Sequence, residues 1–79
     1  MQDSIDVRPL AVGWLVEGRS FANGLTFRSG AAAEQAARRL AENYARAGRT
    51  TAVCIYLRDG SLAGRFLYAG PQGDLAIAS

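Results

Sequence analysis

The sequence predicts a single α+β domain: an antiparallel β-sheet of two hairpins, in the order β-β-α-β-β, with one amphipathic helix packed on one face. Three observations predict this fold. Polar and apolar residues alternate near the N-terminus, apolar residues recur at helical spacing in the middle, and two β-rich runs flank an Asp-Gly pair near the C-terminus. Strands followed by a helix and more strands are typical of an α+β domain.

The length of 79 residues leaves no room for a second domain, because domains usually contain about 100 to 200 residues. We expect this domain to span residues 1–70 and residues 71–79 to form a flexible C-terminal tail. The composition is 49% hydrophobic and 20% charged, which is typical of a globular chain rather than a disordered one.

The N-terminal segment predicts a hairpin. Residues 4–8 alternate polar and apolar side chains, the period of a half-buried strand, and a proline then ends the run. Strand character resumes over residues 14–17, so Gly13 is expected in or beside the turn. Residues 19–27 give a mixed signal, because an Asn-Gly turn dipeptide interrupts their apolar residues. A third short strand and an ordered loop both fit this segment.

A helix is predicted from Gly30 to Ala47, where apolar residues recur three and four positions apart. Ser29 is a suitable N-cap, because its hydroxyl can accept a hydrogen bond from one of the first unpaired amides. Gly48 can adopt the left-handed conformation that ends many helices. The inner stripe is mostly alanine, so the helix is expected to lie close to the sheet. Acidic and basic side chains four positions apart on its outer side, starting with Glu34 and Arg38, are expected to pair.

The second hairpin is predicted over residues 50–58 and 61–68, because Asp59-Gly60 between them is a strong signal for a tight turn. A two-residue loop would place Val53 opposite Phe66 on the core side of the sheet. We expect a core of seven residues, which are Trp14, Val16, Leu40, Tyr44, Val53, Ile55 and Phe66.

Three segments together resemble a known family. They are GWLVEG at residues 13–18, FRSGAAAEQAARRLA at 27–41 and VCIYLRDGSLAGRFLY at 53–68. In their order and spacing, over Ile5 to Tyr68, they resemble small prokaryotic proteins that form a domain of unknown function, number 2188 in that series. The chain departs from the family in lacking a Lys at the helix entry and in carrying Tyr56 where a His is frequent. The resemblance implies a compact β-β-α-β-β body and assigns neither an activity nor functional residues.

The residues that usually carry chemistry are sparse. The chain has no His, and its one Cys, Cys54, lies between apolar residues of an expected strand, where a packed thiol is the simplest interpretation. The carboxylates do not converge as a catalytic or metal-binding set. We therefore expect no enzyme activity, no cofactor, no metal and no small-molecule ligand. A single Cys and the lack of a signal-peptide or membrane-spanning pattern favour the bacterial cytoplasm and no membrane partner.

The sheet face opposite the helix is the expected interaction surface, because apolar and Arg side chains coincide there with no acids in the pattern to neutralise them. One hypothesis is a homodimer formed through this apolar face. The alternative is a single-stranded nucleic acid bound by guanidinium groups and an aromatic ring, although the net charge is only +2. The candidate binding residues are Arg58, Arg65, Tyr56, Leu67 and Arg19.

Overall fold

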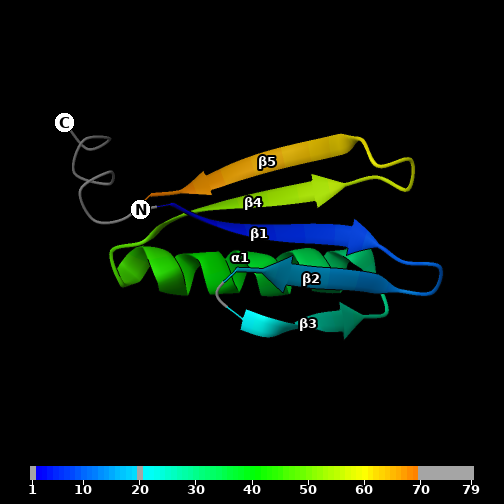
Figure 1. The fold of residues 1–79 in the computed structure, drawn as a ribbon, viewed down its shortest axis with the longest axis horizontal. Helices are drawn as coiled ribbons and strands as arrows, with labels where there is room; N and C mark the ends of the chain where they lie inside the picture. Colours follow the sequence, from blue (N-terminus) through cyan, green and yellow to red (C-terminus); the bar gives the residue numbers. More distant parts are fainter. Residues whose placement is uncertain (1, 20, 70–79) are drawn as a thin grey trace.

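The computed structural model describes residues 2–19 and 21–69 of the chain. The expected flexible tail, residues 71–79, lies outside the described residues. Six elements follow one another along the chain (Figure 1): β1 Gln2–Pro9, β2 Trp14–Gly18, β3 Phe21–Phe27, α1 Gly30–Arg46, β4 Thr50–Tyr56 and β5 Leu62–Tyr68.

The protein is an α+β domain with one helix on a five-stranded sheet of order β3-β2-β1-β4-β5. Both expected hairpins are present, because β1 pairs antiparallel with β2 and β4 with β5. However, β4 runs parallel to β1, so the sheet is mixed, and the expectation of an all-antiparallel sheet is wrong. The reason is that α1 joins β3 to β4 and runs back along the sheet, so β4 runs in the same direction as β3. Because β1 also runs in that direction, β4 pairs with it in parallel.

The segment that the sequence left open forms a strand, β3, which pairs with β2 at one edge of the sheet. The Asn-Gly dipeptide lies inside this strand and is not a turn. Packing explains the glycine, because a Cβ at Gly24 would collide with the side chain of Leu15 on the neighbouring strand. Gly24 therefore lets Leu15 lie flat across β3.

Both helix ends match the sequence prediction. Ser29 Oγ accepts a hydrogen bond of 3.1 Å from the amide of Ala32. At the other end the amide of Gly48 donates to the carbonyl of Ala45, and that of Arg49 donates to the carbonyl of Tyr44, both at 2.9 Å. This pair of bonds with a left-handed residue is the Schellman motif, and Gly48 has the required positive φ of 89°.

The β4–β5 hairpin has the expected pairing of Val53 with Phe66, but its loop is longer than expected. Leu57 accepts from the amide of Gly60 at 2.9 Å and donates to the carbonyl of Ser61 at 2.8 Å, which closes a three-residue loop. Gly60, with φ of 89°, supplies the left-handed position of this loop. The register then shifts by one residue at Ala63, which restores the expected pairing farther along the strands.

The core lies between the helix and the centre of the sheet. Val16 and Val53 are buried as expected, and the alanine stripe of the helix is buried with them. Four expected core residues, namely Trp14, Leu40, Tyr44 and Ile55, are only partly buried against this cluster. Ile5 and Val7 of β1 are fully buried instead, because β1 is the middle strand of the sheet.

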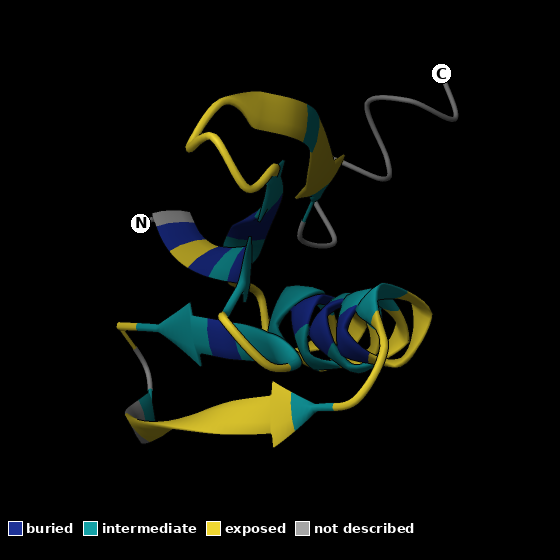
Figure 2. Cartoon of the chain, turned by 90° about the vertical axis from the view of Figure 1, so that its right-hand side faces the viewer, coloured by how far each residue is buried: buried dark blue, intermediate teal, exposed yellow. Residues whose placement is uncertain are grey.

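Phe66 is 39% exposed, so its assignment to the core is wrong. The side chain does face the helix side of the sheet, as its pairing with Val53 requires. The helix, however, covers the central strands, and β5 projects beyond it (Figure 2). The guanidinium of Arg38 on the helix lies over the ring, with its Cζ 4.5 Å from the ring centroid.

The hairpin loop supports a pH-dependent prediction. Asp59 accepts hydrogen bonds from the hydroxyl of Ser61 at 2.6 Å and from its amide at 2.9 Å, and these bonds hold the pKa of Asp59 below its ordinary value of 3.8. A carboxyl with a lowered pKa stabilises the fold above its unfolded pKa, and this stabilisation is lost as the pH falls through the folded pKa. We expect NMR titration of the Asp59 carboxyl carbon to give a midpoint below 3.8, and Ser61→Ala to raise it. A wild-type midpoint at or above 3.8 would contradict the loop geometry.

Candidate interaction surface

The sheet face opposite the helix, called the outer face here, is built by alternate residues of each strand. Because Ile5, Val16 and Val53 point to the helix, their neighbours along each strand point away from it. The outer face therefore carries Ser4, Asp6 and Arg8 of β1, Leu15 and Glu17 of β2, Ala52, Cys54 and Tyr56 of β4, and Arg65 and Leu67 of β5.

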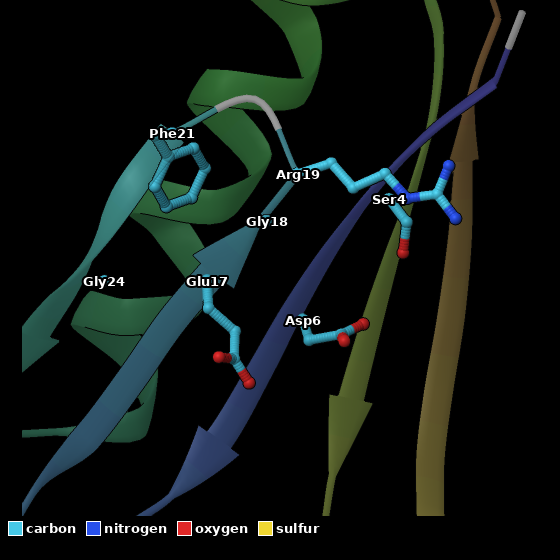
Figure 3. A pocket seen from close by; sticks show the side chains of 7 residues that line it. All are labelled: Ser4, Asp6, Glu17, Gly18, Arg19, Phe21 and Gly24. Carbon is cyan, nitrogen blue, oxygen red and sulfur yellow. The ribbon is translucent and has the colours of Figure 1, made fainter.

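The centre of the outer face is charged and contains two acids. Asp6 and Glu17 lie opposite each other on β1 and β2, and both side chains project from the same side of the sheet (Figure 3). Arg8 Nε donates to Glu17 Oε2 at 2.9 Å, and its Nη2 lies 3.5 Å from Asp6 Oδ2. The expectation that this face lacks neutralising acids is therefore wrong. Asp6 is on β1, which lies beside β4 through the parallel pairing that the sequence did not reveal, and Glu17 is on β2, the next strand of the sheet.

Tyr56 lies on the outer face as expected, but one side of its ring is covered. The guanidinium carbon of Arg8 lies 4.4 Å from the ring centroid, which is the geometry of a cation–π contact. The same Arg8 holds both central acids, so the charged centre and the aromatic ring form one connected cluster. No pattern in the sequence singled out Arg8, because Tyr56 is 48 positions away along the chain.

The five candidate residues do not form one site. Arg65 and Leu67 share the outer face of β5, and Tyr56 lies on the adjacent strand. Arg58 is in the loop at the far end of the hairpin, where it donates to the carbonyl of Leu10 at 3.0 Å. Arg19 follows β2 at the opposite end of the sheet. Because a strand rises about 3.3 Å per residue, a seven-residue strand separates these two arginines by roughly 23 Å.

Exposed apolar side chains gather on one strand. Leu62 is 51% exposed and Leu67 57% on the outer side of β5, and Phe66 is exposed on its other side. We call these three residues the β5 strip. Leu57, also exposed, precedes it in the hairpin loop. The other exposed large apolar residues of the described chain, Val12 and Leu25, lie in the β1–β2 loop and on β3.

A shallow hollow of about 530 Å³ lies at the other end of the outer face. It is lined by Ser4, Asp6, Glu17, Gly18, Arg19, Phe21 and Gly24, and Figure 3 shows Arg19 reaching from the end of β2 toward Ser4. The two carboxylates in the hollow already bind Arg8. Within residues 2–19 and 21–69, no three His, Cys, Asp or Glu side chains are placed to hold a metal ion.

Cys54 is half-buried on the outer face, where the strand register places it between Asp6 and Arg65. Neither neighbour is the imidazole base that commonly activates a thiol, since the chain contains no His.

In the described part of the chain, the single helix is too short and too polar to cross a membrane. Comparison with protein-family models, with curated proteins and with solved structures gave no match. Membership of the family that the sequence motifs resemble therefore stays a prediction.

Proposed function

We propose that this domain is a non-enzymatic assembly module that self-associates through the β4–β5 side of its sheet, with the β5 strip as the contact. The exposure of Leu62, Phe66 and Leu67 on the two sides of one edge strand carries this proposal. Full burial of a large apolar side chain is worth about 1.5 to 3 kcal/mol, so a contact that covers the strip has a substantial driving force.

The size of the domain supports the same proposal. A chain of this length buries only about 60% of its unfolded surface, and its stability is of the order of 0.05 to 0.15 kcal/mol per residue. Association with a second copy would add buried apolar area that one copy lacks. The charged cluster of Asp6, Arg8 and Glu17 disfavours a contact over the centre of the outer face, because burying it would require its desolvation.

A single-stranded nucleic acid is the less supported alternative. Arg19 and Arg58 lie at opposite ends of the sheet, and a strand that joined them would pass over Asp6 and Glu17. One side of the Tyr56 ring is already covered, which limits stacking with a base. Titration of the labelled protein with mixed oligonucleotides tests this alternative, because amide shift changes centred on Arg65 would favour it over self-association.

The proposal predicts that the wild-type chain is a dimer in sedimentation equilibrium and that Phe66→Asp is a monomer. A carboxylate in place of the ring would remove the apolar side chain that the contact buries and would have to be desolvated there, a cost that the nearby guanidinium of Arg38 only partly offsets. In the free monomer the change is mild, because Phe66 is partly exposed. The far-UV circular dichroism spectrum should therefore stay that of the wild type.

Val12→Asp is the matched control, since Val12 is 91% exposed and lies in the β1–β2 loop, away from the β5 strip. It should leave the dimer intact. A wild-type chain that stays monomeric at millimolar concentration would refute the proposed self-association, and so would a Phe66→Asp variant that dimerises as the wild type does.

A further inference from the structure

β5 is an edge strand with little protection against pairing. It is bonded to β4 on one side only, and the sheet order places no other described strand beside it. Natural edge strands are commonly blunted by Pro, by charged side chains, above all Lys, or by bulges. The seven residues of β5, LAGRFLY, contain no Pro and no Lys. Their one charge, Arg65, lies on the outer face, and the register shift at Ala63 lies near the start of the strand. Most of β5 is therefore a regular strand with an unpaired backbone edge.

The opposite edge differs in both sequence and geometry. β3 carries Asn23 and Gly24 at its centre, residue types that disfavour strands, and its pairing with β2 shifts register after Val16. A bulge of this kind twists an edge away from a partner strand. Between the two edges, β5 is thus the one suited to strand addition.

On the basis of the proposed self-association, we infer that two copies of this chain join edge to edge through β5, antiparallel, with Phe66 facing the partner's Phe66. The two five-stranded sheets then form one continuous sheet. The second copy is favoured as the occupant because, in this register, apolar side chains of the strand meet each other and the like charges of Arg65 stay apart.

Symmetry restricts the possible registers. Two antiparallel neighbouring strands of identical chains are related by a two-fold axis perpendicular to the sheet. This rotation leaves every side chain on the same face of the sheet, and directly opposite residues of an antiparallel pair also point to the same face. The axis must therefore pass between one residue and its own copy, which we call the residue on the axis. For β5 the residue on the axis is Gly64, Arg65, Phe66 or Leu67 if most of the strand is to pair.

Charge and overlap select among these four. With Arg65 on the axis, two guanidinium groups would lie directly opposite each other, which is unfavourable. A Gly64 axis places no side chain at the centre of the contact, and a Leu67 axis pairs only residues 65–69 within the described part of the chain. With Phe66 on the axis, residues 63–69 pair, two exposed rings meet, and the like charges of Arg65 are separated along the strands.

This register also accounts for the side chains around the axis. On the helix side, Tyr68 lies opposite the partner's Gly64, so the rings of Phe66 and Tyr68 from both copies gather at the axis. On the outer side, Leu67 lies opposite the partner's Arg65, whose aliphatic stem can pack on the leucine. No acidic group of the described part of β5 has to be desolvated, because the strand contains none.

Disulfide trapping in a Cys54→Ala background tests the register. Directly opposite residues in an antiparallel pair have Cα atoms about 4.5 to 5.5 Å apart, within the range of a disulfide. Phe66→Cys should therefore give a covalent dimer under mild oxidation. Gly64→Cys alone should not, because the two positions would be roughly 14 Å apart along the strands. Mixed with Tyr68→Cys, however, it should give a covalent heterodimer. The Gly64 site accepts a side chain, since a Cβ there would lie 3.6 Å from the Phe66 ring.

Leu67→Asp separates edge pairing from stacking of outer faces. Edge pairing puts the new carboxylate opposite the partner's Arg65, so Leu67→Asp should dimerise about two- to tenfold more tightly than Leu67→Asn, which loses the same leucine without gaining the charge. Stacked faces would instead bury the carboxylate and dissociate the dimer.

The outcomes separate the two proposals. A dimer that traps through Arg65→Cys but not through Phe66→Cys, or that is weaker with Leu67→Asp than with Leu67→Asn, overturns the edge register and leaves self-association standing. A monomeric wild-type chain overturns both. If the full-length protein is monomeric and a variant without residues 70–79 dimerises, the edge pairing is also overturned, because β5 would then be covered within one chain.

Discussion

Replacing Ile5 by Ala is expected to lower the free energy of unfolding by about 2 to 5 kcal/mol, the usual range for a buried Ile. Ile5 is 1% exposed and lies in the middle strand, opposite Gly18 on one side and Val53 on the other. Its neighbours in the core are β-branched residues and the alanines of the helix. Such short side chains on paired strands and a helix cannot move far into the cavity, so we expect a value in the upper half of the range.

Urea denaturation followed by circular dichroism measures this loss. The protein concentration must be the same for each variant, because self-association adds to apparent stability. Val12→Ala is the control and should change the unfolding free energy by less than about 0.5 kcal/mol, since the Val12 side chain is exposed. If the two substitutions cost the same, β1 cannot be the central strand.

Local chemistry explains why the helix and the second hairpin could be predicted. Ser29 and Gly48 act on backbone groups within a few residues of themselves, and these interactions can be inferred from the sequence. The pairing of Val53 with Phe66 follows from a nearby turn in the same way. The parallel pairing of β1 with β4 cannot be inferred like this, because an alternating pattern specifies the buried face of a strand and not its neighbours.

The candidate surface could likewise be predicted where it depends on one hairpin, and not where it depends on the pairing of distant strands. The register of one hairpin placed Arg65 and Leu67 on the same face as Tyr56, and the structure confirms that arrangement. The acids of β1 and β2 reach this face only because the crossover brings β1 beside β4. Phe66 was expected in the core because the sequence indicates which side of the sheet it faces, but not that the helix stops short of β5.

The alanine stripe of the helix is the basis of a second prediction, a large loss of stability on Ala37→Leu. Ala33, Ala37 and Ala41 are fully buried at i, i+4 spacing, and the helix lies against β1, β2 and β4 along this stripe. Methyl groups at these positions let the helix backbone approach the sheet closely. Ala37→Leu would add a branched side chain to a close-packed contact, and overpacking of this kind costs about 1 to 3 kcal/mol and sometimes more. We expect a destabilisation at or above the upper end of that range, because Ala37 is in the middle of the helix and the chain cannot fray to relieve the crowding.

Ala31→Leu is the matched control for this prediction, because Ala31 lies in the same helix and is exposed. Leu and Ala both favour helices, so the control isolates the effect of crowding from that of helix propensity. Urea midpoints measured side by side should show Ala31→Leu near the wild type and Ala37→Leu far below it. Equal midpoints would mean that the gap between helix and sheet can take a larger side chain.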